Sequence, residues 1–340
     1  MKPTDFAYYL SKHLGGHLAG QQNFSTNTVD SYRDTFKLFL VFCKEKKGIK
    51  AEKISIGQFT KPLVNEFLKW LKEDRGCGES TIQQRLTVIR NFFAFLQGEA
   101  PEHLLLCQDI MSIKIKKNPV SAPLNYLTYE GIQSVLSQPD QHTRQGRRDL
   151  VMLTLLYDSG ARVQELADIR VRDLRLDSLA GVNLFGKGSK WRHVPLMKPT
   201  ADLLRTYLDE RKLLGPESAD YPLFTNHSGH KLNRAGIAYT VKKYADAARL
   251  TSPAYIPSTV TPHVFRHSKA MHLLQSGIDL IYIRDILGHA DVKTTEIYAR
   301  IDSDAKRKAL EGVYLTAAPS TILPSWTEDD VVMKMLRDLE

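Results

Sequence analysis

The stretch DLRLDSLAGVNLFGKGSKWRHVPL, residues 173–196, establishes the fold class of the second half of the chain. Its apolar residues alternate with polar ones, whereas the sequence on either side has the three-and-four spacing of helices. This change of period predicts three short strands, at residues 173–177, 182–185 and 191–196. Residues 186–189, Gly-Lys-Gly-Ser, separate the last two strands. Because glycine supplies the positive φ angles of a tight turn, we expect these two strands to form an antiparallel hairpin.

Helices are predicted on both sides of this small sheet. Thr128 opens a helix that runs through Leu136, and an apolar segment at 147–157 predicts a central helix. A break at residues 158–160 precedes a new helix that begins at Ala161. After the sheet, helices are expected near residues 200–214, 233–249, 264–276, 279–287 and 292–299. The second half is therefore predicted to be mainly α-helical with a small antiparallel β-sheet.

The first hundred residues have only helical periodicity. Apolar residues that share one face predict helices at 29–43, 61–74 and 80–96, which together suggest a helical N-terminal domain. Residues 112–125 then contain three lysines and two prolines and have no helical period. That composition predicts an extended basic linker between two domains.

The composition excludes several classes of protein. Hydrophobic residues make up 42% of the 340 residues and charged residues 25%, which is typical of a globular protein and too apolar for a disordered one. No apolar run reaches the roughly 20 residues of a membrane span, and the N-terminus lacks a secretory signal pattern. Three widely spaced cysteines argue against a disulfide framework and a zinc knuckle. We therefore expect a soluble, cytoplasmic protein.

The charge is unevenly distributed along the chain. The formal net charge is +9, with +6 in each of residues 1–117 and 118–300 and −3 in residues 301–340. Two basic bodies suit a partner with a phosphate backbone, such as a nucleic acid duplex. A solvated surface rich in lysine explains the same charge equally well.

Short motifs in the second half carry residues that could meet at one phosphate. They are Arg162 in SGARVQEL, Lys187 in the hairpin turn, His263 and Arg266 in HVFRHS, His289 in LGHA, and Tyr298 in TTEIYARI. Each residue alone also has a structural explanation: an exposed arginine paired with Glu165, a solvated turn, a helix cap or a core tyrosine. Six such residues in the order that one phosphate-transfer site needs favour the functional interpretation.

The ordered set resembles the signature of the tyrosine recombinase, or phage integrase, family. The pattern A-R-x-x-E-L, a lysine on a β-hairpin, H-x-x-R-H, L-G-H and T-x-x-Y is matched at every position across residues 120–300. The N-terminal helices are similar to the family's core-binding domain. This resemblance implies a C-shaped clamp on DNA, with a core-binding domain at 1–111, a linker at 112–125, a catalytic domain at 126–315 and a tail at 316–340.

The resemblance also implies a role for each matched residue. Tyr298 would attack a DNA phosphate and form a 3′-phosphotyrosyl intermediate, and Arg162 and Arg266 would hold the phosphate with bidentate guanidinium groups. The position of His263 implies a general base, and that of Lys187 a general acid. His289 would contact the phosphate or the attacking oxygen. Glu165 would support the site, and neither a metal ion nor another cofactor nor ATP is implied.

Basic residues outside this set are expected to contact the DNA backbone. These are Lys69, Lys72, Arg85, Arg90, Lys114, Lys116, Lys117 and Lys190. Lys190 is also an alternative to Lys187 as the general acid. His267 and His272, near the site in sequence, are interpreted as structural or capping residues, and His13 and His17 as surface residues.

The family resemblance leads to a functional hypothesis with two alternatives. We expect a prokaryotic, nucleoid-associated site-specific recombinase that acts on inverted-repeat sites in integration, excision or resolution of a mobile element or replicon. It would be a monomer when free and a homotetramer on two DNA sites, with possible accessory DNA-bending or directionality proteins. A type IB topoisomerase and a catalytically silent DNA-binding regulator are the alternatives.

The last residues predict one more interaction. Thr327 and the acids that follow it predict the start of a short helix, with an apolar face that includes Val331 and Leu336. A helix this short on a tether is not stable alone. We expect it to dock on a neighbouring protomer, with docking on its own domain as the alternative.

Overall fold

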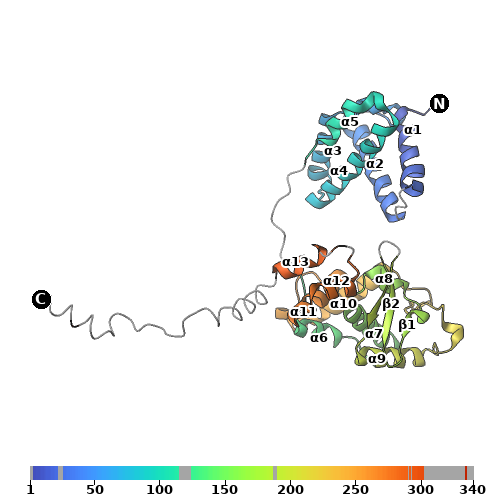
Figure 1. Cartoon of the computed structure of the whole chain (residues 1–340), viewed down its shortest axis with the longest axis vertical. Coiled ribbons are helices and arrows are strands. Elements are labelled where there is room, and N and C mark those ends of the chain that lie inside the picture. The colour runs from blue at the N-terminus through green and yellow to red at the C-terminus, as the bar shows by residue number, and fades with distance from the viewer. Residues whose placement is uncertain are drawn as a thin grey trace. The chain divides into compact units, whose positions relative to one another are not determined.

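The computed structural model describes residues 3–21, 26–114, 124–186, 190–289, 291, 293–301 and 334. The chain divides into two compact units, Met1–Ser121 and Ala122–Glu340 (Figure 1). Each unit has its own cluster of buried apolar side chains, so each can be described by itself. No helix within the described ranges is long and apolar enough to cross a membrane.

The first unit is helical. Its elements are α1 (Asp5–Lys12), a π-helical continuation (His13–Gln21), α2 (Thr26–Lys47), α3 (Lys61–Glu73), α4 (Glu79–Glu99) and α5 (Leu104–Met111), with short 3₁₀ turns at Ala51–Lys53, Ile56–Gln58 and Pro101–His103. Aromatic rings fill the core: Phe39 stacks on Phe59 with centroids 4.3 Å apart, and Phe6 of α1 lies 4.9 Å from Phe59. The three expected helices are present as α2, α3 and α4.

The structure adds α1, its π-helical continuation and α5 to the expected helices. It also shows that the prediction for His13 is wrong. His13 is 1% exposed and packs against the rings of His17, Phe92 and Phe95. The π-helical backbone turns this side chain inward, and no local sequence period encodes that turn.

The two ends of the segment expected to be a linker, residues 112–125, contain apolar residues that pack in the folded units. Ile113 is buried in the core of the first unit, and Leu124 packs against a cluster in the second. Both ends of the 112–125 segment are therefore part of the folded units. Residues 115–123, with Lys116 and Lys117, lie outside the described residues.

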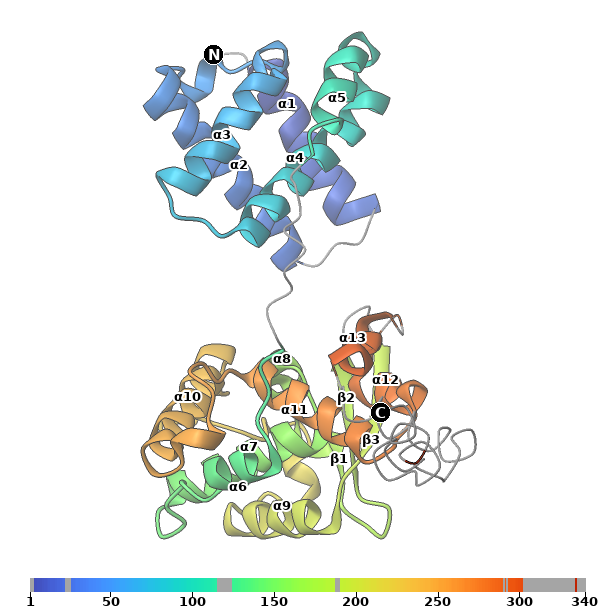
Figure 2. The same cartoon turned by 90° about the vertical axis from the view of Figure 1, so that its left-hand side faces the viewer.

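The second unit combines helices with one small sheet. Its helices are α6 (Tyr129–Leu136), α7 (Arg144–Ser159), α8 (Val163–Asp168), α9 (Lys198–Glu210), α10 (Arg234–Thr251), α11 (Pro262–Gln275), α12 (Leu280–Leu287) and α13 (Lys293–Ile301), with 3₁₀ turns at Val171–Asp173, Pro216–Ser218 and Pro253–Tyr255. In Figure 2 the sheet lies on one side of α7 and α11, and α10 on the other. This mainly helical fold with a small sheet confirms the predicted fold class.

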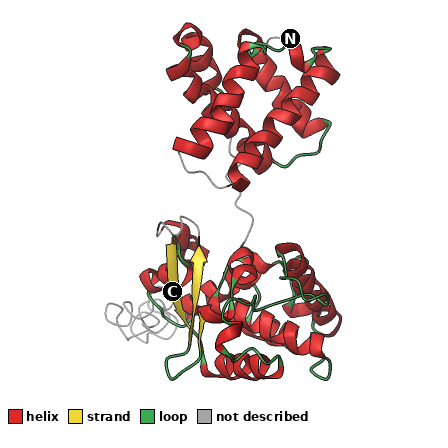
Figure 3. Cartoon of the chain, turned by 90° about the vertical axis from the view of Figure 1, so that its right-hand side faces the viewer, coloured by secondary structure: helices red, strands yellow, loops and turns green. Residues whose placement is uncertain are grey.

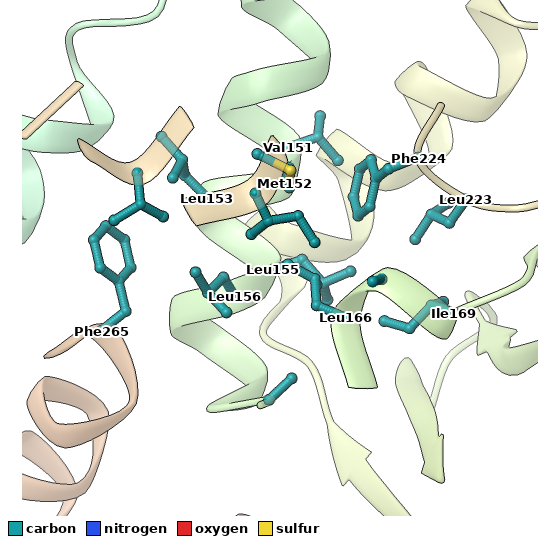
Figure 4. Close-up of a cluster of buried hydrophobic side chains, with 14 of the residues drawn as sticks. Val151, Met152, Leu153, Leu155, Leu156, Leu166, Ile169, Leu223, Phe224 and Phe265 are labelled. Atoms are coloured by element: carbon teal, nitrogen blue, oxygen red, sulfur yellow. The ribbon is translucent and has the colours of Figure 1, made fainter. Parts of the chain in front are cut away.

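The core of this unit is built around α7. Apolar side chains between Val151 and Leu156 point to several sides of α7 (Figure 4). They pack against Leu166 and Ile169 of the α8 region and against Phe265 of α11. Met152, Leu153, Leu155 and Leu156 are fully buried. The apolar segment of the sequence is central for this reason, because a helix covered on most sides must be apolar on most sides.

The sheet is antiparallel, in the order β1 (Leu174–Arg175), β2 (Gly181–Gly186) and β3 (Lys190–Pro195). Figure 3 shows strands in yellow beside the red helices of this unit. Val182 pairs with Val194, and Phe185 with Trp191. Val182, Leu184 and Val194 face the core, while Phe185 and Trp191 are exposed. The hairpin register therefore follows the alternation in the sequence, and the turn residues 187–189 lie outside the described part of the chain.

Candidate active site

Glu165 lies at the centre of a group of arginines in the second unit. Its Oε2 accepts a hydrogen bond from the backbone N–H of Arg162 at 2.8 Å, and its Oε1 accepts one from the Arg162 guanidinium at 2.8 Å. Arg192 of β3 donates to both oxygens, at 2.9 and 2.7 Å. The side chain of Glu165 is only 4% exposed, so one buried carboxylate orients two guanidinium groups.

The charges of these arginines dominate the electrostatics of the carboxylate. Burial raises the pKa of Glu165, but the hydrogen bonds and charge of Arg192 and Arg162 outweigh it and lower the pKa to about 2. Glu165 is therefore ionised at neutral pH. The sequence did not lead us to predict a role for Arg192. The one indication of that role is that Arg192 lies on the inward face of a hairpin strand, 27 residues from Glu165.

Arg266 joins two helix ends. It is 4% exposed, and its guanidinium donates to the carbonyl oxygen of Gly160 at 2.7 Å and to that of Leu287 at 2.6 Å. Burial and the nearby charge of Arg162 lower the pKa of Arg266 to about 9, so it remains a cation at neutral pH. The C-terminal ends of α7 and α12 thus meet at one guanidinium, as expected where carbonyl groups are left unpaired.

Two glycines make these helix ends possible. Gly160 and Gly288 both cap a helix with positive φ, +57° and +65°. A Cβ on Gly288 would lie 2.9 Å from Cδ of Arg192. The carbonyl oxygen of Gly288 accepts a hydrogen bond from Arg162 at 3.2 Å. Arg192 also donates to the Ile286 carbonyl at 3.0 Å. The end of α12 therefore fixes the arginine group from one side.

Tyr298 of α13 lies beside these cations, and its side chain is buried at 1% exposure. Its hydroxyl forms a 2.9 Å hydrogen bond with Nδ1 of His267, and the ring of His289 stacks parallel to it with centroids 6.5 Å apart. Burial raises the pKa of Tyr298, while the charges of Arg266 and Arg162 lower it less strongly. The phenol is therefore protonated at neutral pH but faces a positive environment that favours its ionised form.

The two histidines that the family signature places here differ in their surroundings. His289 bonds through Nδ1 to the buried Thr295 hydroxyl at 2.9 Å, and burial followed by the nearby arginines lowers the pKa of His289 to about 4. His263 is exposed on α11, and its ring centroid is 6.5 Å from that of His267. The hydrogen bond to Tyr298 belongs to His267, which the sequence analysis interpreted as structural.

The hairpin approaches the same group. A Cβ added to Gly186 would lie 2.8 Å from Oε1 of Glu165 and 3.1 Å from Nη1 of Arg192, so only a glycine lets the strand pass this closely. Lys187 follows directly but lies outside the described residues. Lys190, the first residue of β3, is exposed.

The basic residues expected to contact DNA in the first unit have two kinds of environment. Lys69, Lys72, Arg90 and Lys114 are exposed. Arg85 is half-buried and donates at 2.9 Å to both the Ser31 carbonyl and the Thr35 hydroxyl, which ties α4 to α2. A DNA contact by Arg85 therefore has the least structural support of the set.

The arrangement is suited to binding an anion. Two guanidinium groups, of Arg162 and Arg192, share one carboxylate, and a third, of Arg266, bonds only to backbone carbonyls. The charges of Arg162 and Arg266 act on the Tyr298 hydroxyl, so the site beside it is net positive. Guanidinium forks match the oxygens of a phosphate. Within the described residues, no three His, Cys, Asp or Glu side chains gather as a metal-binding group.

The chain matches two family models and is similar to several known proteins. Residues 125–304 match the phage integrase family, and residues 15–100 match the phage integrase N-terminal SAM-like domain. The integrase/recombinase y4rC of Sinorhizobium fredii is 33% identical over 310 residues, 91% of this chain and 92% of that protein. The tyrosine recombinase XerC of Roseiflexus castenholzii is 33% identical over 293 residues, 85% of this chain and 88% of that protein.

A solved structure shares the fold. The XerH site-specific recombinase bound to a palindromic difH substrate superposes with a TM-score of 0.68 at 20% identity, covering 88% of this chain and 84% of that one. The family match spans more than half of the chain and confirms the resemblance seen in the sequence. The chain therefore belongs to the phage integrase family of tyrosine recombinases, which cleave and rejoin DNA strands in site-specific recombination.

Proposed function

We propose that Tyr298 is the nucleophile of this recombinase and that Arg162 and Arg266 bind the phosphate it attacks. The observation that carries the proposal is the position of the Tyr298 hydroxyl, whose ionisation both guanidinium groups favour. A phosphodiester gains negative charge on its non-bridging oxygens in the transition state, so fixed cations stabilise that state more than the ground state. Glu165 holds Arg162 in place before the DNA arrives.

The chemistry proceeds in two balanced steps. The Tyr298 hydroxyl gives its proton to a neighbouring base as its oxygen bonds to phosphorus, and the bond from phosphorus to the 5′-oxygen breaks. The product is a 3′-phosphotyrosyl enzyme. We assign protonation of the leaving 5′-oxygen to Lys187, because the strand that leads to it reaches Glu165 at Gly186. A 5′-hydroxyl of a partner strand then reverses the reaction. The energy of the cut bond is kept in the phosphotyrosyl link, so ATP is not needed.

His263 and His289 complete the proposed set at the phosphate. The ring of His289 is fixed by Thr295, and both histidines have a pKa below the ordinary value, first through burial and then through the arginines. A neutral imidazole can donate one hydrogen bond to a phosphate oxygen. We propose this contact for both residues, with His263 approaching from the exposed side of α11.

Double-stranded DNA with inverted-repeat sites is the proposed substrate. The XerH recombinase, which shares the fold, is bound to a palindromic DNA substrate in its own structure. Exposed cations of the first unit, among them Lys69, Lys72 and Arg90, would contact the backbone, so that the two units form a C-shaped clamp. Integration, excision and resolution of a mobile element or replicon all use this chemistry.

We further propose that four copies assemble on two DNA sites and that the C-terminal segment links them. Residues 327–340 carry a net charge of −3 and an apolar set that includes Val331 and Leu336. Apart from Lys334 this segment lies outside the described residues. Residues 118–300 of a second copy carry a net charge of +6, which is opposite in sign to that of this segment. The proposed domain boundaries are 1–111, 112–125, 126–315 and 316–340.

Recovery of covalent protein–DNA adducts from cells tests the nucleophile and finds the substrate together. Cells expressing the wild-type chain or Tyr298→Phe are lysed under denaturing conditions, and DNA ends attached to the protein are sequenced. Tyr282→Phe is the matched control, because Tyr282 is a 66% exposed tyrosine on the adjacent α12. We expect adducts at a few inverted-repeat sites from the wild type and from Tyr282→Phe.

Tyr298→Phe is expected to give none, since phenylalanine has no oxygen to bond to phosphorus. Adducts that persist in Tyr298→Phe would assign the nucleophile to another residue. Adducts spread over the whole genome would indicate a topoisomerase and would contradict site-specific recombination. Absence of adducts from the wild type would leave a DNA-binding regulator as the better description.

A further inference from the structure

Two histidines stand one turn apart on α11, and they have different relations to Tyr298. His267 bonds through Nδ1 to the Tyr298 hydroxyl at 2.9 Å, with the ring centroids 5.8 Å apart. His263 is the exposed member of the pair, and its ring lies 6.5 Å from that of His267. The contact with the attacking oxygen therefore comes from the histidine that follows Arg266, the one that sequence reasoning interpreted as structural.

The protonation state of His267 suits a proton acceptor. Burial lowers the pKa of His267 below its ordinary value of 6.5, and the charges of His263 and Arg266 lower it further. The imidazole is therefore neutral at pH 7.5, with a lone pair on one ring nitrogen. With the proton on Nε2, Nδ1 accepts the hydrogen bond from the tyrosine hydroxyl and lies on the path that its proton must take.

The charged groups around the pair favour a transfer that is reversible. His263 and Arg266 flank His267 on its own helix, His289 faces it from the turn after α12, and Tyr298 faces it from α13. Arg266 and Arg162 stabilise the phenolate form of Tyr298. The same positive charges oppose an imidazolium at His267, so the proton held there returns readily.

We propose that His267 is the proton acceptor for the Tyr298 hydroxyl during strand cleavage, and its proton donor during rejoining. The inference rests on the proposed role of Tyr298 as nucleophile. In cleavage the Oη–H proton moves to Nδ1 as the bond from Oη to phosphorus forms and the bond from phosphorus to the 5′-oxygen breaks. In rejoining a 5′-hydroxyl attacks phosphorus, and the imidazolium returns its proton to the departing tyrosine oxygen.

The test separates proton acceptance from the other steps by choice of substrate. A duplex oligonucleotide carrying the adduct site mapped in cells is made with sulfur in place of the bridging 5′-oxygen at the scissile phosphate. A thiolate leaves without a proton donor, so the rate of phosphotyrosyl formation no longer depends on the general acid. Single-turnover rates are measured on the full chain at saturating enzyme from pH 6 to pH 9.5.

The key variant is His267→Asn, because the asparagine Oδ1 takes the place of Nδ1 as a hydrogen-bond acceptor but is not basic. His263→Asn is the competing variant on the same helix, because the resemblance to the family implies a general base at that position. His142→Asn is the neutral control, because His142 is exposed and lies outside the proposed set. General base catalysis contributes about 10²- to 10⁴-fold, so we expect His267→Asn to lose about 100-fold or more at pH 7.5. We expect His263→Asn to lose less than His267→Asn, because it removes a proposed phosphate contact and not the proton acceptor, and we expect His142→Asn to match the wild type.

The pH profile distinguishes a proton acceptor from a residue that only positions the tyrosine. Because the pKa of Tyr298 is raised above 10, the rate of His267→Asn should rise about tenfold per pH unit up to pH 9.5 as solvent ionises the phenol. The wild-type rate should be flat above pH 7 and fall only in more acid solution, where His267 becomes protonated, because the pKa of His267 is lowered. This recovery at high pH is not expected of a structural defect.

Three results would overturn the proposal: a loss of less than tenfold in His267→Asn, a larger loss with no recovery at high pH, or a greater loss in His263→Asn. Circular dichroism melting checks the fold, and His267→Gln replaces His267→Asn if the latter does not fold. Tyr298→Phe is run beside them. If it still cleaves, the proposed nucleophile is wrong, which is distinct from failure of the His267 assignment.

Discussion

Replacing Glu165 by glutamine removes one negative charge from beneath Arg162 and Arg192 with almost no change in shape. Glutamine thus imitates the protonated carboxyl group. The ordinary pKa of 4.5 is lowered to about 2 in the folded chain. A pKa difference of about 2.5 at roughly 1.36 kcal/mol per pH unit gives about 3 kcal/mol. We expect Glu165→Gln to lower the free energy of unfolding of the second unit by that amount at pH 7.

An independent argument gives a similar magnitude. The side chains of Glu165 and Arg192 are 4% and 11% exposed, and breaking a buried ion pair typically costs about 3–5 kcal/mol. Glu210→Gln is the matched control, because Glu210 pairs with Arg147 at side-chain exposures of 29% and 35%. An ion pair that is this exposed to solvent contributes at most about 1 kcal/mol to stability.

Urea unfolding of the full chain followed by circular dichroism measures both variants. Neither substitution lies in the first unit, so the unfolding transition of that unit should not shift. The transition that does shift is therefore that of the second unit. The folded pKa is depressed, so the stabilisation is complete above pH 4.5 and is lost as the pH falls toward 2. The gap between wild type and Glu165→Gln should therefore narrow by about 2 kcal/mol between pH 7 and pH 3. A gap below 1 kcal/mol at pH 7, or one that does not narrow in acid, would show that the arginines do not stabilise this carboxylate as described.

Gly288→Ala should destabilise the chain by about 2 kcal/mol or more in urea unfolding, against about 1 kcal/mol for Gly277→Ala, because both have positive φ but only the first would crowd Arg192. Arg192→Lys should cost about 1–2 kcal/mol in the same assay and exposed Arg175→Lys under 0.5 kcal/mol, since only Arg192 forms a buried fork; equal losses would contradict this. His272 is buried and its pKa is lowered to about 4, so the wild type should lose up to about 3 kcal/mol of stability as the pH falls from 6.5 to 4. In His272→Asn this pH-dependent loss should be absent, as urea unfolding at pH 6.5 and pH 4 would measure.

The local elements of this protein could be predicted from the sequence because their signals are local. Helices α2, α3 and α4 and the helices of the second unit follow the 3.6-residue period, and the strands follow the two-residue period. Gly160 and Gly288 were visible as breaks, and both end a helix with positive φ. The ordered set from Arg162 to Tyr298 was visible because each motif is short and continuous in the chain.

Other features depend on contacts that no local pattern contains. The π-helical turn that buries His13 and the helices α1 and α5 were not predicted, because their apolar faces are short. Arg192 looked like any polar residue on a hairpin strand. Its pairing with Glu165, 27 residues away, exists only because β3 packs beside α8 and the end of α12.

The histidines of α11 show most clearly what the sequence determines and what the tertiary structure determines. That His263, Arg266 and His267 share a helix beside a phosphate-binding set follows from the amino-acid order alone, because spacing along a helix fixes which residues are neighbours. Which histidine meets Tyr298, 31 residues further on, depends on the folded chain. A hydrogen bond requires an approach within about 3 Å, and the packing of α13 against α11 sets that distance.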